Sequence, residues 1–272
     1  MSRLLGLDLD GTLLDPDGTV TARVAEALQR AVDAGFAIAI LTARPARDVP
    51  ASVRDRIPTA ACWAYSNGTL VQATGDARPR RLAGLAPHTV RWLLHELTAV
   101  APDWTFAADL ADATVARVPF PTRETRPWNN VRHVAELTLT EPASKILVRT
   151  GAPVGPAEVA RVQEVIRDRG EATASGGWYV EINPTGAGKA PALRWVATAL
   201  GVPMRQVTAV GDGLNDLPML AAAGRSAAPA NATEAVRGAV DHLLPGNRED
   251  AVAVLVDLLL AGDGARPAAV AD

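Results

Sequence analysis

Residues 6–14 read Gly-Leu-Asp-Leu-Asp-Gly-Thr-Leu-Leu, an apolar segment interrupted by two aspartates and closed by a glycine. The leucines before and between the acids form the near-continuous apolar run of a strand that is buried on both faces of a parallel sheet. Because residues two apart on a strand point the same way, Asp8 and Asp10 are expected to project together at its carboxyl end, where open α/β sheets bind ligands. Two carboxylates this close repel each other, so the pair predicts a bound dication or an unusual protonation state.

The composition is that of a globular protein. Of the 272 residues, 48% are hydrophobic and 21% charged, and no apolar run approaches the ~18 residues that a membrane span needs. A net charge of -3 with scattered basic residues argues against nucleic acid as a ligand, because such proteins usually carry a concentrated basic patch. The N-terminus has no signal-peptide pattern and the single cysteine, Cys62, cannot form an internal disulfide, so a cytoplasmic location is expected. The oligomeric state stays open.

Hydrophobic patterning predicts an α/β protein in which two regular segments flank a less regular insert. The flanking segments, 1–83 and 184–272, are expected to form a doubly wound, Rossmann-like parallel-sheet core. Residues 84–183 are expected to form a separate α/β domain, because the pattern changes among Gly and Pro residues at both borders. The elements expected in the core are a helix capped by Thr21, strand 36–41, a helix begun by Pro45, strand 60–65, a hairpin of 69–72 with 78–82, helix 189–200, strand 206–210, helix 216–223, strand 241–244 and helix 249–260.

Polar residues gather where the predicted strands end and the predicted helices begin. The four clusters are Asp8 with Asp10, Thr42 with Arg44, Lys189, and Gly211-Asp212-Gly213-Leu214-Asn215-Asp216. In a parallel sheet the carboxyl ends of the strands meet at one edge, so these clusters are expected to converge. Asp212 and Asp216 lie four residues apart at a strand-to-helix junction, and with Asp8 they could supply hard oxygen ligands for Mg²⁺. A bound dication would relieve the repulsion between the acids.

This combination of groups suits phosphoryl transfer. Carboxylate-bound Mg²⁺, a lysine and a threonine hydroxyl beside helix-terminal amides can stabilise phosphate oxygens. Asp8 could then attack phosphorus and form an aspartyl-phosphate, while Asp10 protonates the leaving oxygen and later takes a proton from the hydrolytic water. Only Lys145 and Lys189 are lysines among the 27 basic residues, so a lysine at 189 is informative in a chain that otherwise uses arginine.

The order and position of these clusters resemble the four motifs of the haloacid dehalogenase superfamily. The matching stretches are Asp8-x-Asp10-Gly-Thr-Leu, Thr42-x-Arg44, Lys189 and Gly211-Asp212-x-x-Asn215-Asp216. The insert at 84–183 resembles the class IIB α/β caps of that superfamily. Three further stretches resemble the Cof-type phosphatases, so that the resemblance spans nearly the whole chain: Asn67-Gly68, Ser175-Gly-x-x-Tyr-Val-Glu-Ile and Asn231-Ala-x-Glu-x-Val.

The resemblance implies a Mg²⁺-dependent phosphomonoester hydrolase that acts on a small phosphorylated metabolite, with a sugar phosphate favoured. The implied roles are nucleophile for Asp8, acid/base for Asp10, phosphate ligands for Thr42, Lys189 and Asn215, and Mg²⁺ ligands for Asp8, Asp212, Asp216 (directly or through water) and the main-chain carbonyl of Asp10. Arg44 and Asn67 are candidate substrate-binding residues. The chain departs from the pattern at Ala190-Pro191, where relatives usually have glycine after the lysine; a proline in the first turn of a helix is tolerated.

Other functions stay open at this point. A phosphosugar mutase of the same superfamily would keep every motif, and a catalytically silent binding or regulatory protein could use the same fold. A P-loop at Lys189 is excluded, because Asn183 stands at its first glycine position and Ala190 replaces the required Ser or Thr. Lys145 is equally consistent with a structural and a substrate-facing role. A group of insert residues could bind an anionic or sugar-like substrate: Trp104, Arg117, Arg123, Trp128 and Arg132.

Overall fold

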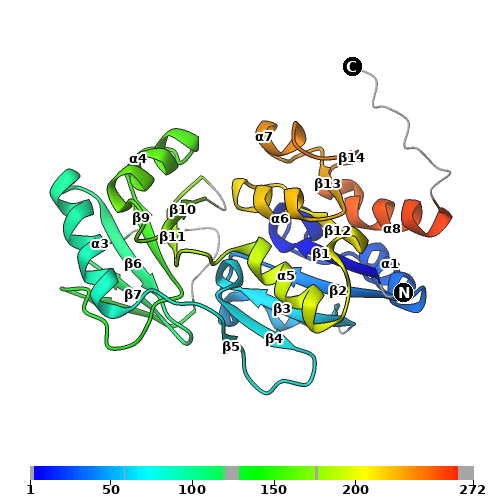
Figure 1. The fold of residues 1–272 in the computed structure, drawn as a ribbon, viewed down its shortest axis with the longest axis horizontal. Helices are drawn as coiled ribbons and strands as arrows, with labels where there is room; N and C mark the ends of the chain where they lie inside the picture. The colour runs from blue at the N-terminus through cyan, green and yellow to red at the C-terminus, as the bar shows by residue number, and fades with distance from the viewer. Residues whose placement is uncertain (1–2, 58, 119, 121–128, 175–176, 263–272) are drawn as a thin grey trace. The chain divides into compact units, whose positions relative to one another are not determined.

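The computed structural model describes residues 3–57, 59–118, 120, 129–174 and 177–262 (Figure 1). The chain forms two compact units. The first unit consists of Met1–Leu41, Pro50–Trp63 and Leu193–Asp272, and the second of Thr42–Val49 and Ala64–Ala192. A border between the units passes through one strand, Ala60–Tyr65 (β3). These units therefore do not test the predicted domain borders at residues 84 and 183, which stay a prediction.

The larger sheet has eight strands in the order β14-β13-β12-β1-β2-β3-β4-β5. β1 pairs in parallel with both β2 and β12, so that Asp8 stands opposite Leu41 and Leu7 opposite Val210. The leucines of β1 are fully buried, which confirms the sequence-based assignment to the middle of a parallel sheet. The strands are β1 (Arg3–Asp8), β2 (Phe36–Leu41), β3, β4 (Leu70–Ala73), β5 (Arg80–Arg81), β12 (Val207–Val210), β13 (Arg225–Pro229) and β14 (His242–Leu244).

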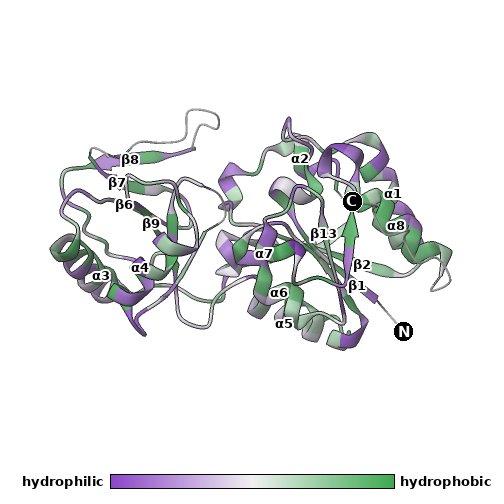
Figure 2. Cartoon of the chain, turned by 90° about the horizontal axis from the view of Figure 1, so that it is seen from above, coloured by the Kyte–Doolittle hydropathy of each residue, from purple (hydrophilic) through white to green (hydrophobic). Residues whose placement is uncertain are grey.

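Helices that pack beside this sheet bury an apolar face. In the first unit α1 (Ala22–Asp33) packs against α8 (Ala251–Ala261), and α8 is hydrophobic along most of its length (Figure 2). Arg30 and Asp257 close the edge of this pair with an ion pair of 2.7 Å. The other described α-helices outside residues 84–183 are α2 (Ala51–Arg54), α5 (Lys189–Ala199), α6 (Leu217–Ala222) and α7 (Glu234–Arg237). Within the described part of the chain, no helix has the length and hydrophobicity to cross a membrane.

The smaller sheet lies in the second unit and has six strands in the order β10-β11-β9-β6-β7-β8. Its pairs are antiparallel except β7 with β8. Two helices, α3 (Pro87–Val100) and α4 (Pro156–Ile166), contact each other and share with the sheet a core that includes Leu93, Phe106 and Val148. The strands are β6 (Thr105–Asp109), β7 (Thr114–Arg117), β8 (Val131–Val134), β9 (Lys145–Arg149), β10 (Glu171–Thr173) and β11 (Val180–Asn183).

Most predicted core elements are confirmed, and two differ from the prediction. β2 and β3 have the predicted ends. The helix expected from Pro45 is instead a single 3-10 turn, Ala46–Asp48, followed by the short α2, because Pro50 cannot donate the amide hydrogen bond that a continuous helix needs. β13 was not predicted, since Arg-Ser-Ala-Ala-Pro has few of the residues that favour strands; it exists because β12 and β14 pair with it on both sides.

Thr21 is the predicted cap of α1, and its contacts define a stability test. Its hydroxyl oxygen accepts a hydrogen bond from Val24 N at 3.1 Å and donates one to Asp250 Oδ1 at 2.7 Å. Thr21→Ala should lower the free energy of unfolding by about 1–2 kcal/mol, because the first turn of α1 loses its acceptor. Thr21→Ser keeps the hydroxyl and should lose much less. Urea unfolding followed by circular dichroism measures both; equal losses would contradict the capping role.

Candidate active site

The chain leaves β1 through a wide turn that carries the first acids. β1 ends at Asp8, and the turn Leu9–Leu13 is closed by a hydrogen bond from Leu14 N to Leu9 O of 2.9 Å. Asp8 is buried and Asp10 is half-buried. The strand therefore ends two residues earlier than the sequence predicts, and Asp10 stands in the turn with an extended backbone, followed by Gly11 at a φ of 78°. That the side chains of Asp8 and Asp10 project together stays a prediction.

The second acidic stretch follows β12, the parallel neighbour of β1. Asp216 Oδ2 accepts hydrogen bonds from the amides of Asp212 at 3.0 Å and Gly213 at 2.9 Å. Asp212 Oδ1 accepts a hydrogen bond from Thr12 Oγ1 at 2.9 Å. A hydrogen bond between two side chains thus joins the turn after β1 to the turn after β12. Asn231 adds a third connection, since its Nδ2 donates to Gly11 O at 2.7 Å.

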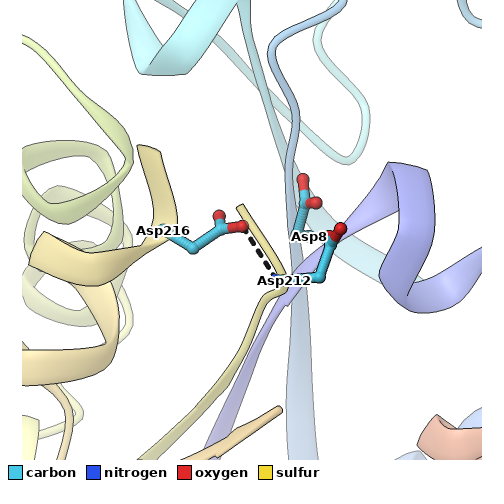
Figure 3. A group of neighbouring side chains, drawn as sticks. All are labelled: Asp8, Asp212 and Asp216. Atoms are coloured by element: carbon cyan, nitrogen blue, oxygen red, sulfur yellow. Dashed lines mark hydrogen bonds between the residues drawn. The ribbon is translucent and has the colours of Figure 1, made fainter. Parts of the chain in front are cut away.

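Three carboxylates lie close together, one from the end of β1 and two from the stretch after β12 (Figure 3). Asp8, Asp212 and Asp216 each offer an oxygen, and these oxygens all lie within 4.8 Å of one another. An octahedral Mg²⁺ holds its ligands at ~2.1 Å, so opposite ligand oxygens lie about 4 Å apart. The upper limit of 4.8 Å is compatible with this value, and the three donors are all hard carboxylate oxygens. The cluster therefore fits Mg²⁺ or a similar hard dication.

Two glycines allow the acids to come this close. A Cβ added to Gly11 would lie 2.4 Å from Asp212 Oδ2, and a Cβ added to Gly211 would lie 2.4 Å from Asp216 Cγ. Real side-chain carbons do not approach other atoms so closely, so any larger residue at either position must displace a carboxylate. In the sequence Gly11 marks the expected end of a strand; its closeness to Asp212, far away along the chain, is visible only in the structure.

The predicted phosphate-binding and substrate-binding residues are divided between the two units. Asn215 is in the first unit, directly before Asp216, and is buried. Thr42 follows the last residue of β2, and Lys189 is the first residue of α5; both side chains are buried. The residues assigned to the second unit are Thr42, Arg44, Asn67 and Lys189. Their convergence on Asp8 stays a prediction.

Thr42 and Arg44 form a tight local arrangement. Arg44 N donates to Thr42 Oγ1 at 3.0 Å, and the Arg44 guanidinium donates through NH1 to Asp48 O at 3.2 Å. Burial raises the pKa of the neighbouring Asp48 carboxyl, against the opposing effects of a hydrogen bond from the Asn129 amide and of the Arg47 charge. The short loop after β2 is therefore held by its own polar groups.

Several polar residues of the second unit were not assigned a role from the sequence. Lys145, left open there, is buried and forms an ion pair with Glu181, with Nζ and Oε1 2.6 Å apart. Arg47 is paired with Asp109 and also donates to Leu110 O at 3.0 Å. The scarcity of lysine was the one signal that pointed to Lys145. Glu181 had a weaker signal, as the acid in the apolar run Tyr-Val-Glu-Ile.

The described members of the insert group differ in burial, and a joint role in substrate binding stays a prediction. Trp104 is a core residue, 3% exposed, with the Arg161 guanidinium 4.8 Å from its ring centroid. Arg117 and Arg132 are exposed, and Arg132 donates to Asp112. Arg123 and Trp128 lie outside the described residues. A buried tryptophan and exposed arginines follow the usual burial preferences of these residue types.

The sequence of this chain is similar to a family of hydrolases and to individual phosphatases. A model of the haloacid dehalogenase-like hydrolases matches residues 5–85 and 122–256. YwtE of Bacillus subtilis (strain 168), a 5-amino-6-(5-phospho-D-ribitylamino)uracil phosphatase, is 27% identical over 286 residues, 96% of this chain and 99% of its own length. A phosphoglycolate phosphatase of Pyrobaculum neutrophilum is 30% identical over 246 residues, 90% of each chain.

A similar solved structure confirms the fold class. The structure of the haloacid dehalogenase subclass IIB sugar phosphatase BT4131 matches with a TM-score of 0.80 and 17% identity, covering 95% of this chain and 99% of that one. At this identity the likeness concerns the fold alone. It confirms an α/β, Rossmann-like core with an inserted α/β cap, as the sequence predicted.

Gly11→Ala tests whether close packing of the acids supports metal binding. The new Cβ would push on the Asp212 carboxylate and strain a backbone with φ of 78°, so Mg²⁺ affinity should fall about 10-fold or more, as it does when groups that support a metal ligand are removed. Isothermal titration calorimetry measures the affinity. Gly35→Ala is the matched control, because Gly35 has φ of 87° with nothing near its Cβ. Equal Mg²⁺ affinities in the two variants would contradict this role for Gly11.

Proposed function

Because this chain belongs to the haloacid dehalogenase-like hydrolase family, we propose that it is a Mg²⁺-dependent phosphatase that hydrolyses a small phosphorylated metabolite through an aspartyl-phosphate. Hydrolysis of a phosphoric monoester rests on the family and on full-length relatives named as phosphatases. The observation that carries the finer proposal is the meeting of Asp8, Asp212 and Asp216 at the end of β1. One carboxylate of such a cluster can act as nucleophile when a dication neutralises the group it attacks.

Each acid has a separate part in the proposed reaction. Bound by Asp8, Asp212, Asp216 and the main-chain carbonyl of Asp10, Mg²⁺ would supply positive charge that offsets the charge of the phosphate oxygens. An oxygen of Asp8 attacks phosphorus, and the bond from phosphorus to the leaving oxygen breaks. Asp10 gives its proton to that oxygen and then takes a proton from a water molecule. The water oxygen attacks phosphorus, which releases inorganic phosphate and the Asp8 carboxylate.

The other motif residues are proposed to bind the phosphate. The Thr42 hydroxyl can donate a hydrogen bond, the Asn215 amide can donate two, and Lys189 contributes a compact positive charge. Burial of all three side chains supports this proposal, because a charge or donor held away from water acts more strongly on a phosphate oxygen. Arg44 and Asn67 are proposed to contact the rest of the substrate.

The substrate is proposed to be a small polar phosphomonoester, with sugar phosphates favoured, and its specificity is proposed to reside in the insert at 84–183. A panel of phosphorylated metabolites tests this. It should contain hexose and pentose phosphates together with the compounds in the names of the relatives, phosphoglycolate and the phosphorylated ribitylamino-uracil. Phosphate release without a bisphosphate activator would exclude a mutase, and turnover of any of these compounds would exclude a catalytically silent protein.

Asp8→Asn tests the role of Asp8 as nucleophile independently of its effect on stability. The amide cannot attack phosphorus, so kcat for p-nitrophenyl phosphate should fall at least about 10³-fold, as for other nucleophile replacements. In metal-free buffer the same variant should melt at a higher temperature than the wild type, because it removes one of three repelling charges. Phosphate-release kinetics and differential scanning calorimetry measure the two effects. Retained hydrolysis would refute covalent catalysis.

Metal removal tests the acid cluster as a whole. EDTA should abolish turnover, and excess Mg²⁺ should restore it, since without the dication the carboxylates repel the phosphate group. Saturating Mg²⁺, at about 100 times its dissociation constant, should also stabilise the fold by roughly 2.7 kcal/mol through mass action. Asp212→Asn should weaken both effects. Turnover that is unchanged in EDTA would show that the cluster does not hold an essential metal.

A further inference from the structure

A buried polar network in the second unit connects the six-stranded sheet to the loop after β2. Lys145, the first residue of β9, donates from Nζ to Glu181 Oε1 at 2.6 Å and to Ala43 O at 2.8 Å. The other carboxylate oxygen of Glu181 accepts from Asn67 Nδ2 at 2.7 Å. Lys145 and Glu181 are each 4% exposed. Both oxygens of the acid and the ammonium group are thus engaged within one buried network.

This network contributes to fixing the backbone around the predicted phosphate-binding threonine. Three successive carbonyls of the loop each accept a hydrogen bond from outside it, one of them from a charged side chain. The acceptors and donors are Thr42 O with Asn67 N at 3.0 Å, Ala43 O with Lys145 Nζ at 2.8 Å, and Arg44 O with Ser66 N at 2.9 Å. Two of the donors, Ser66 and Asn67, have left-handed backbone angles, φ of 47° and 56°, which non-glycine residues adopt only where the surroundings impose them.

The contact at Ala43 O acts on Thr42 through one peptide plane. Because the peptide unit is planar and trans, the carbonyl of Ala43 and the N–H of Arg44 point in opposite directions. Lys145 therefore orients that N–H when it binds the carbonyl. The same N–H donates to Thr42 Oγ1 at 3.0 Å. A threonine hydroxyl that accepts this bond still has its proton to donate, so its direction is set for a phosphate oxygen.

Stability alone is a weak reason for a buried pair of this kind. Removing two opposite charges from water costs several kcal/mol per ion, and apolar residues of similar volume often do as well or better. The chain also uses arginine for nearly every positive charge, and Lys145 is one of only two lysines. A compact ammonium with three donors can reach a carboxylate and a carbonyl together, whereas the planar fork of arginine suits paired oxygens. The choice of lysine here matches the carbonyl contact.

We infer that Lys145 and Glu181 are positioning residues for phosphate binding: they orient the Ala43–Arg44 peptide, and through it the Thr42 hydroxyl. This inference rests on the proposed phosphatase function. Neither residue needs to touch the substrate. Two strands of the insert, β9 and β11, would thus support phosphate binding by the loop after β2.

A double-mutant cycle with Thr42 tests the inference. Lys145→Met combined with Glu181→Gln removes both charges without leaving one unpaired, and should raise the inhibition constant of inorganic phosphate about 10- to 100-fold, the cost of misplacing a binding group by about 1 Å. KM for p-nitrophenyl phosphate should rise in parallel. In a Thr42→Ala background the same pair of changes should add no more than about twofold, because the two sites act through one hydroxyl.

Matched controls separate positioning from folding. Arg149→Met removes a positive charge from the other end of β9, where the guanidinium donates to Trp178 O at 3.3 Å, and should leave both constants unchanged. If Lys145→Met alone does not fold, the charge-free double variant still provides the measurement. Melting temperatures report stability, which a purely structural pair would change without changing the constants of the folded fraction.

The outcomes distinguish the inference from the proposed function. A wild-type protein that hydrolyses no phosphomonoester would overturn both. An active wild type with equal effects of the double variant in the two Thr42 backgrounds, or with no effect on the phosphate constant, would overturn the positioning role alone. Non-additive effects with an unchanged Arg149→Met control would establish it.

Discussion

Repulsion among three carboxylates is the constraint on which the first unit depends. Two like charges 4 Å apart in a protein environment repel by about 4 kcal/mol, and oxygens of Asp8, Asp212 and Asp216 all lie within 4.8 Å of one another. The fold holds them there by several means. Parallel pairing aligns the ends of β1 and β12, backbone amides bind Asp216, and Gly11 leaves room for an acid. A bound dication or a changed protonation state would relieve this repulsion.

In the second unit, buried carboxylates lie beside positive charges. Two of its buried carboxylates are already paired with cations, Glu181 with Lys145 and Asp109 with Arg47. Both cations also donate to main-chain carbonyls, Ala43 O and Leu110 O respectively. Paired buried charges add little net stability, but removing one partner is strongly destabilising because it leaves the other charge unpaired. The acids of the first unit could therefore accept an ion, whereas the cations of the second unit bind main-chain carbonyls.

Prediction from sequence succeeded where one local signal dominated. The apolar runs of β1, β2 and β3 and the cap at Thr21 are all determined within a few residues, and the structure confirms them. It failed where partners elsewhere decided the outcome. β13 has a poor strand sequence and forms because two strands flank it. Asp10 was expected at the end of the strand, but β1 ends at Asp8 and Asp10 lies in the turn that follows. Lys145 donates its hydrogen bonds to residues 36 and 102 positions away.

The sequence by itself determined the α/β class and the order of the motif residues, and it determined that acids would stand at the end of a buried strand. These features are set by periodicity and by residue type, which act over a few positions. Only the tertiary structure decided which acids meet, why glycine is required beside them, and which buried lysine orients the loop after β2. Each of these depends on distances between segments far apart in the chain, and no local pattern encodes such a distance.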